Sequence, residues 1–196
     1  MYDYITGDII ELSPTDLVIE CNNIGYKSLI SLQTFSALKK GDRAKIFIYQ
    51  HIREDSNQLY GFINKEEREI FLQLIEVSGI GPNTGRMMLS SLTTDELKAA
   101  ILSGDVTKIK SVKGIGLKTA QRLIIDLKDK IGKKQSTDIG DTIPGYLSSP
   151  HKEEAITALI LLGFSKASVE KVVSLILTQN PDISLEELIK QSLKKL

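Results

Sequence analysis

The sequence predicts a multidomain α+β protein with an N-terminal five-stranded β-barrel, a central all-α region and a small C-terminal three-helix domain. Two observations predict this division. The spacing of apolar residues changes from a strand pattern to a helical pattern near Lys65, and a stretch rich in chain-breaking residues follows position 132. We therefore expect domains at residues 1–63, 64–132 and 150–196, with a flexible linker at 133–149.

The first 63 residues have the composition of short strands. Turn signals such as Ser13-Pro14, Asn22-Asn23 and Gly41-Asp42 separate segments rich in β-branched and aromatic residues. The predicted strands are Tyr4–Glu11, Leu17–Cys21, Gly25–Leu32, Lys45–Ile52 and Gln58–Ile63. Five short strands in so few residues favour a small OB-like barrel. Residues 34–38 are expected to form a short helix or an irregular connection.

From Lys65 the apolar residues recur with helical spacing. Thr93 and Glu96 have the spacing of a capping box and predict a helix start, and Ser103-Gly104-Asp105 predicts the end of one helix and the start of another. A longer amphipathic helix is expected over Lys118–Lys130.

Residues 132–150 have no apolar period and predict a linker. Ser149-Pro150 then predicts a helix start, because serine is a good N-cap and proline suits the first helical position. Helices are expected at about Lys152–Leu162, Lys166–Leu177 and Leu185–Leu193, with a second capping box at Ser184 and Glu187. These helices would form a three-helix, UBA-like domain.

Composition excludes several classes of protein. The N-terminus lacks the pattern of a signal peptide and no apolar run is long enough to span a membrane, so we expect a cytoplasmic protein. Cys21 is the single cysteine, and His51 and His151 are the only histidines. These residues are too few for a disulfide or a zinc site, so no metal site is predicted, and no cofactor or catalytic residue is predicted either.

Two segments of the central region repeat the same pattern 35 residues apart. Each places an apolar helix end before Gly-Ile-Gly and a new helix start, at Gly79-Ile80-Gly81 and at Gly114-Ile115-Gly116. The first glycine can adopt the left-handed conformation that ends a helix, and the isoleucine can enter the core. The second glycine lets a phosphate approach the free N–H groups of the next helix. The repeat thus predicts a pair of backbone phosphate clamps.

Other glycine-rich motifs fit less well. A dinucleotide-binding motif would need a glycine where Thr84 and Thr119 stand and a strand before each copy, and a Walker loop fails because Leu117 separates Gly116 from Lys118. Lys113, Lys118 and Arg122 could add charge at the second hairpin, whereas Arg86 is the basic residue near the first. The predicted DNA-phosphate-binding residues are Gly79, Gly81, Asn83, Thr84, Gly114, Gly116, Lys118, Thr119 and Arg122.

The charge distribution agrees with a central nucleic-acid interface. The net charge of the chain is zero, but residues 64–134 contain 13 basic and 9 acidic residues, a net of +4. The excess is mild and would carry little argument without the hairpins.

The doubled hairpin resembles the helix-hairpin-helix pairs of many DNA repair proteins. The order of barrel, hairpin pair, linker and small helical domain, with the segments Arg53–Phe62 and Ala158–Phe164, resembles the RuvA family over the whole chain. Asn83 departs from the family pattern, in which a basic residue often follows the first hairpin. That departure puts DNA affinity in question.

The resemblance implies a non-catalytic subunit that binds four-way (Holliday) DNA junctions in recombination and repair. It implies a homotetramer, with an octamer as an alternative, and an acidic pin at Glu54 and Asp55 that repels phosphates at the crossover. It also implies that the third domain recruits the hexameric RuvB ATPase through Leu159, Leu162 and Phe164, with the linker as a tether. The RuvC resolvase is a further partner that the family allows. Without the resemblance, the acidic pair would be a solvated turn and the apolar residues would be core.

Two other functions remain open from the sequence. A base-excision glycosylase would combine a hairpin with a catalytic aspartate about 20 residues later, and Asp138 has that offset but no companion nucleophile. A single-strand binder would use Phe47, Tyr49 and Tyr60 as stacking platforms, although a place in the barrel core is the plainer expectation for these rings.

Overall fold

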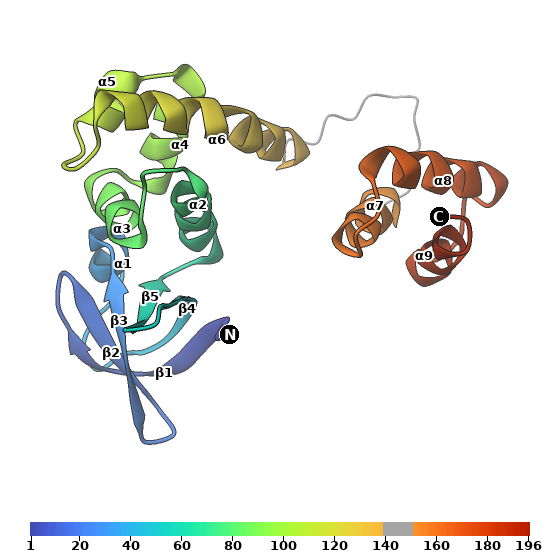
Figure 1. Ribbon diagram of the computed structural model, residues 1–196. Coiled ribbons are helices and arrows are strands. Elements are labelled where there is room, and N and C mark those ends of the chain that lie inside the picture. The colour runs from blue at the N-terminus through green and yellow to red at the C-terminus, as the bar shows by residue number, and fades with distance from the viewer. Residues whose placement is uncertain (139–150) are drawn as a thin grey trace. The chain divides into compact units, whose positions relative to one another are not determined.

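The computed structural model describes residues 1–138 and 151–196, without the side chains of 133–138. The chain divides into two compact units, and the boundary between them falls within residues 139–150 (Figure 1). Most of the expected linker and the predicted helix start at Ser149-Pro150 lie outside the described residues.

The N-terminal strands close into the predicted five-stranded barrel. They are β1 (Tyr4–Leu12), β2 (Asp16–Cys21), β3 (Ile24–Ile30), β4 (Arg43–Ile52) and β5 (Asn57–Phe62). The order around the barrel is β1-β2-β3-β5-β4, and the only parallel pair in this part of the chain joins β3 to β5. The barrel encloses a core of Ile5, Leu17, Ile19, Ile30, Ile46 and Ile48.

The third strand ends two residues earlier than predicted. Ser31 leaves the strand and becomes the N-cap of α1 (Leu32–Ser36), since its hydroxyl accepts a hydrogen bond from the Thr34 amide at 3.0 Å. This cap turns the backbone out of the sheet. In the segment 34–38, for which a short helix or an irregular connection was expected, residues 34–36 are helical, and the helix begins at Leu32.

Five helices follow the barrel. They are α2 (Lys65–Glu76), α3 (Pro82–Ser91), α4 (Thr94–Ser103), α5 (Val106–Lys110) and α6 (Leu117–Asp138). The predicted capping box at Thr93 and Glu96 is present in both directions, which confirms this helix start. Gly104 ends α4 in the left-handed conformation, with φ of 75°, and the Asp105 side chain caps α5.

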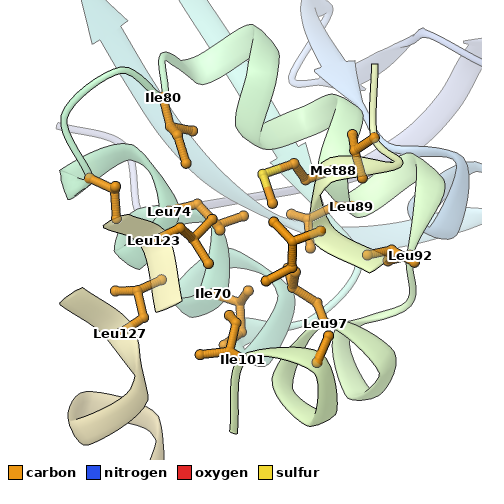
Figure 2. Close-up of a cluster of buried hydrophobic side chains, with 14 of the residues drawn as sticks. Ile70, Leu74, Ile80, Met88, Leu89, Leu92, Leu97, Ile101, Leu123 and Leu127 are labelled. Atoms are coloured by element: carbon orange, nitrogen blue, oxygen red, sulfur yellow. The ribbon is translucent and has the colours of Figure 1, made fainter. Parts of the chain in front are cut away.

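These helices share one apolar core (Figure 2). Figure 1 shows α2 and α3 between the barrel and the layer formed by α4, α5 and α6. Side chains from α2, the first hairpin, α3, α4 and α6 meet in this core, among them Ile70, Leu74, Ile80, Met88, Leu97, Ile101, Leu123 and Leu127. Each fully buried aliphatic side chain of this size contributes roughly 1.5–3 kcal/mol through burial, so the core fixes the relative positions of the two hairpins.

Aromatic rings join the barrel to the helices. Phe71 of α2 lies with its ring centroid 5.4 Å from those of Tyr49 and Tyr60 and 4.8 Å from that of Phe62. The expectation that Phe47, Tyr49 and Tyr60 fill the barrel interior is wrong, because they lie on its outer face and pack against the helical core. The strand pattern could not reveal which face of β4 the helices cover.

A buried carboxylate makes a second joint. Glu67 of α2 is fully buried, and its two oxygens accept hydrogen bonds from the hydroxyls of Ser31 and Thr34, the latter at 2.7 Å. Burial raises the pKa of the Glu67 carboxyl, and these hydrogen bonds oppose the increase. Glu67 thereby ties α2 to the end of the barrel.

The last helix of this unit is longer than predicted. α6 continues to Asp138, six residues into the expected linker at 133–149. Residues such as lysine and glutamine in this stretch are good helix formers even without an apolar period, so the helix can extend past its last core contact.

The second unit contains α7 (His151–Leu161), α8 (Lys166–Gln179) and α9 (Leu185–Leu193). Their shared core consists of Ala155, Leu159, Val169, Val173, Ile176 and Leu188. At the start of α9, the Ser184 hydroxyl accepts from the Glu187 amide at 3.4 Å, but the Glu187 carboxylate accepts from Gln191 instead of completing the predicted box. No helix in the described residues is long and apolar enough to cross a membrane.

Candidate nucleic-acid interface

The first hairpin joins α2 to α3. Gly79 has a φ of 95°, which only glycine adopts readily, and it lets the chain turn directly after α2. Ile80 is 4% exposed, and its side chain points into the helical core (Figure 2). Its backbone amide donates to the Val77 carbonyl at 3.0 Å. Gly81 is the N-cap of α3, and Pro82 follows in the first turn as predicted.

The second hairpin repeats this geometry between α5 and α6. Gly114 has a φ of 93°, Ile115 is 5% exposed, and its amide donates to the Val112 carbonyl at 3.1 Å. The Gly116 carbonyl accepts from Ala120 at 2.9 Å, as the Gly81 carbonyl accepts from Gly85 at 2.9 Å. The sequence repeat is therefore a structural repeat, with equivalent hydrogen bonds 35 positions apart.

At the second glycine of each hairpin, neither a left-handed backbone nor a neighbouring atom excludes a side chain. Gly81 has an extended conformation, with φ of −90°, and Gly116 is not among the residues with positive φ. A Cβ atom added to either would meet nothing within 4 Å. Both positions are exposed, so another molecule has room to approach the backbone there.

The two hairpins lie next to each other. A Cβ atom added to Gly79 would lie 3.8 Å from the side chain of Thr119, which belongs to the first turn of α6. The folded chain thus brings the first glycine of one hairpin to the helix start of the other. Free N–H groups at the starts of α3 and α6 form an environment that attracts anions.

Basic side chains flank only the second hairpin closely. Lys118 and Arg122 of α6 are exposed, and Arg122 has a weak ion pair with Asp126, in which Nε lies 3.6 Å from the carboxylate. Because that pair is exposed and long, it costs little to exchange Asp126 for a phosphate. Thr84 and Thr119 are half-buried in the first turns of their helices.

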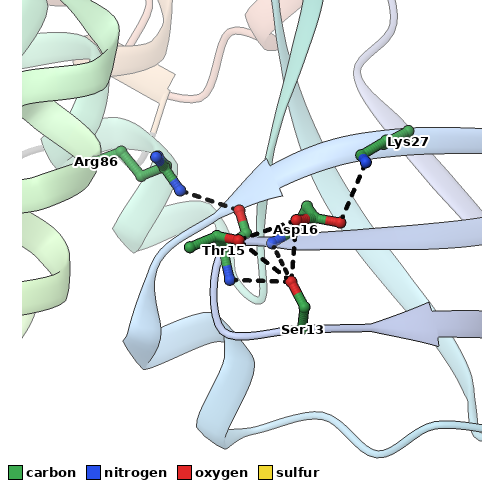
Figure 3. A network of polar contacts seen from close by, with 5 residues as sticks. All are labelled: Ser13, Thr15, Asp16, Lys27 and Arg86. Carbon is green, nitrogen blue, oxygen red and sulfur yellow. Dashed lines mark hydrogen bonds and ion pairs between the residues drawn. The ribbon is translucent and has the colours of Figure 1, made fainter.

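The first hairpin differs because its basic residue is occupied. The Nη1 atom of Arg86 donates to the backbone carbonyls of Thr15 at 3.0 Å and Ile30 at 3.2 Å, which holds α3 against the barrel (Figure 3). Thr15 itself belongs to a polar turn in which Asp16 accepts hydrogen bonds from Ser13 and Thr15 and pairs with Lys27. Asn83 is exposed, and its side-chain oxygen accepts from the Tyr60 hydroxyl at 3.2 Å.

The acidic residues predicted to form a pin lie at the tip of the β4–β5 turn. The Arg53 amide donates to the Ser56 carbonyl at 2.8 Å and closes the turn around Glu54 and Asp55. Both carboxylates are exposed. The turn places two negative charges on the surface of the same compact unit as the hairpins.

The residues predicted to contact a partner fall into different environments. Leu159 is completely buried in the core of the second unit, where its side chain presents no surface to a partner. Leu162 is 60% exposed, whereas Phe164 is partly buried against the core. Leu161 was not predicted and is 82% exposed. Its position two residues after Leu159 places it on another side of α7, which the helical period could have indicated.

The remaining candidate chemistry finds little support. The described residues contain no group of three or more histidine, cysteine, aspartate or glutamate side chains that could hold a metal ion. Asp138 is the last residue of α6, and its side chain lies outside the described residues. Tyr60 is 2% exposed and its ring is packed against Phe71, which leaves its face unavailable for stacking on a base.

Together, the closed barrel and the paired hairpins define a protein of the tandem helix-hairpin-helix class. Family models agree: residues 1–61 match the RuvA N terminal domain, 71–129 match a SAM-like helix-hairpin-helix tandem, and 150–196 match the RuvA C-terminal domain. The chain belongs to the RuvA family.

Curated relatives agree over the full length. Proteins from Bacteroides fragilis, Christiangramia forsetii and Porphyromonas gingivalis are 50%, 48% and 45% identical to this chain, with complete coverage of both sequences. Each is named Holliday junction branch migration complex subunit RuvA.

Proposed function

We propose that this protein binds four-way DNA junctions through their phosphate backbone and serves as a subunit of a branch migration complex. The observation that carries the proposal is the structural repeat of the two hairpins, each with an exposed second glycine at which an added side chain would meet no atom of the protein. The names of the full-length relatives support the same function.

Each hairpin would hold one stretch of phosphate backbone. Four glycines would shape the two loops and leave their backbone without covering side chains: Gly79, Gly81, Gly114 and Gly116. The phosphates would be surrounded by Arg122 and by residues in the first turns of α3 and α6, which are Asn83, Thr84, Lys118 and Thr119. Backbone N–H groups cannot distinguish bases, so binding would depend on the shape of the DNA and on salt, and hardly on sequence.

The acidic turn would act at the centre of the junction. Glu54 and Asp55 carry negative charge where the strands exchange, and they would repel phosphates and keep the strands apart. This role needs several subunits around one crossover, for which a homotetramer matches the four arms of the junction. An octamer would cover both faces of the DNA.

The C-terminal unit would recruit the motor. Its exposed leucines, Leu161 and Leu162, offer an apolar surface to the RuvB ATPase, and Phe164 supports that surface from the core side. In this arrangement the chain itself is non-catalytic and RuvB hydrolyses ATP. The RuvC resolvase would act on the same junction as a further partner.

The test is a gel-shift competition in magnesium-free buffer between a synthetic four-way junction and a linear duplex with the same arm sequences. We expect a strong preference for the junction that persists when the arm sequences are scrambled. Equal affinity for the two DNAs would refute the proposed function and leave the hairpins as a general DNA-binding surface. Release of a damaged base from duplex DNA would favour the glycosylase instead.

A further inference from the structure

The outer face of β4 and β5 continues beyond the aromatic joint toward the acidic turn. In the antiparallel pair, Tyr49 lies opposite Tyr60 and His51 lies opposite Gln58. Alternate residues of a strand point to the same face, so these four side chains form one strip. From Tyr49 to Arg53 at the turn, the strip extends roughly 13 Å, about four phosphate spacings of roughly 3.4 Å along the axis of one DNA strand.

One end of this strip reaches the first hairpin. The Tyr60 hydroxyl donates to the side-chain oxygen of Asn83, and the rings of Tyr49 and Tyr60 are 6.1 Å apart. The other end is the turn with Glu54 and Asp55. A DNA strand that runs from the crossover to the first hairpin would therefore pass over this strip.

At the turn end, an arginine is held by a histidine. The Nε atom of Arg53 donates to Nε2 of His51 at 2.9 Å. Because an arginine can only donate, Nε2 of His51 must be unprotonated and the ring proton must be on Nδ1. That nitrogen lies 3.3 Å from the Tyr49 hydroxyl and can donate to it. The neutral ring thus fixes the direction of the guanidinium.

This contact leaves the outer part of the guanidinium available. Among the described residues, neither Nη atom of Arg53 has a hydrogen-bond partner, and no ion pair joins Arg53 to Glu54 or Asp55. Arg53 is exposed. The two Nη groups form the fork that binds phosphate oxygens in a bidentate way.

Within the described part of the chain, the first hairpin has no free basic side chain close to it in sequence, which is relevant to the role of Arg53. Arg86, the basic residue nearest that hairpin in sequence, is used to hold α3 on the barrel. Burial raises the pKa of the Tyr60 hydroxyl, and the positive charges of Arg86 and, to the smallest extent, Arg53 oppose the increase. Arg53 can therefore supply the cation that the hairpin lacks.

We propose that Arg53 is a phosphate-binding residue between the acidic turn and the first hairpin, and that His51 is a positioning residue that directs its guanidinium toward the DNA. The inference rests on the proposed function, because it assumes that a junction strand passes between those two features. Arg53 would attract a backbone phosphate, while the neighbouring Glu54 and Asp55 would repel phosphates. Together they would move each strand away from the crossover to one side.

The experiment compares the full-length protein with the variants Arg53→Gln, His51→Phe and His51→Gln. Junction affinity is measured against salt concentration in magnesium-free buffer. Phenylalanine keeps a ring beside Tyr49 but cannot accept from Arg53, whereas the side-chain oxygen of glutamine can. Arg43→Gln is the matched control, since Arg43 lies at the other end of β4 in an exposed pair with Asp8.

We expect Arg53→Gln to bind the junction roughly ten-fold or more weakly, the value of one charge-assisted hydrogen bond. The slope of log affinity against log salt should become shallower by about 0.9 for each subunit in which the substitution removes a phosphate interaction. His51→Phe should show the same two changes, the double variant Arg53→Gln/His51→Phe should show no further weakening, and His51→Gln should retain most of the affinity. Arg43→Gln should match the unsubstituted protein.

The outcomes separate this inference from the function on which it rests. If the unsubstituted protein prefers junctions and Arg53→Gln retains both its affinity and its salt slope, the role of Arg53 is refuted while the function stands. If the unsubstituted protein shows no preference, the function itself fails. If His51→Gln loses as much affinity as His51→Phe while all variants unfold at the same temperature, His51 does not act by accepting from Arg53.

Discussion

The second glycine of each hairpin gives the sharpest test of the phosphate clamp. In the variants Gly81→Ala and Gly116→Ala, one methyl group is added at a position where it would meet no atom of the chain within 4 Å. The backbone at Gly81 has a φ of −90° and a ψ of 172°, which alanine adopts without strain. The substitution should therefore affect DNA binding and leave the fold intact.

The expected change in stability is small because two effects oppose each other. Alanine restricts the unfolded chain and stabilises the folded state by about 0.4–1 kcal/mol. As an N-cap it is poorer than glycine, by an amount of the same order of magnitude. We expect the free energy of unfolding from urea titration to stay within about 0.5 kcal/mol of the original value.

Binding should change far more. The methyl group would stand where a phosphate oxygen has to approach the N–H groups of α3 or α6, and breaking each hydrogen bond to a charged group costs about 1.5–3 kcal/mol. Junction affinity should fall roughly ten- to a hundred-fold for each hairpin. Gly114→Ala is the contrasting variant, since its φ of 93° makes it destabilising by about 1–2 kcal/mol. Normal junction affinity of the stable double variant Gly81→Ala/Gly116→Ala would refute the clamp.

Three other predictions test neighbouring parts of the argument. The double variant Lys118→Ala/Arg122→Ala should bind all DNA sequences equally weakly relative to the original protein. The slope of log affinity against log salt should become shallower by about 0.9 for every phosphate that the protein no longer neutralises. An unchanged slope would exclude Lys118 and Arg122 as phosphate ligands. Glu67→Gln should reduce the pH dependence of stability, because glutamine does not titrate, although its amide nitrogen cannot accept one of the two hydroxyl hydrogen bonds. Since the pKa of Glu67 is raised above its ordinary 4.5, the folded state binds the proton more tightly and stability falls as pH rises through the raised value. Urea titrations across this range should show that fall in the original protein and a smaller one in the variant, and equal pH profiles would contradict it. Leu159→Ala should destabilise the C-terminal unit by about 2–5 kcal/mol. By contrast, Leu162→Ala should leave its thermal unfolding almost unchanged and weaken RuvB binding in a pull-down, and intact binding would exclude Leu162 from the RuvB interface.

Local sequence signals predicted those features that depend on neighbours along the chain. The capping box at Thr93, the left-handed glycines and the buried isoleucines of the hairpins all depend on fewer than six consecutive residues. Their physical requirements are strict, since positive φ strongly favours glycine and a helix start needs a partner for its free N–H groups. The structure therefore confirms these predictions at the named positions.

Features that depend on distant contacts could not be predicted in this way. Arg86 reaches the carbonyl of Thr15 across 71 positions of sequence, and Glu67 meets Ser31 across 36. In the sequence each looks like an ordinary charged residue on a helix. Likewise, the helical period separates Leu159 from Leu161 on α7, but only the placement of the neighbouring helices shows that the side of Leu159 is the buried one.

These distant contacts matter to function because they determine the distance between the acidic turn and the hairpins. A barrel and a helical domain joined by a free linker could not present two charged features at a fixed separation. Here Phe71 packs against the outer face of β4 and β5, Glu67 binds the barrel end of α1, and Arg86 binds two barrel carbonyls. The barrel and the hairpins thus belong to one compact unit. A strand that leaves Glu54 and Asp55 would meet the first hairpin at a set position, which is how a surface made of backbone and a few charges can select a DNA shape without reading bases.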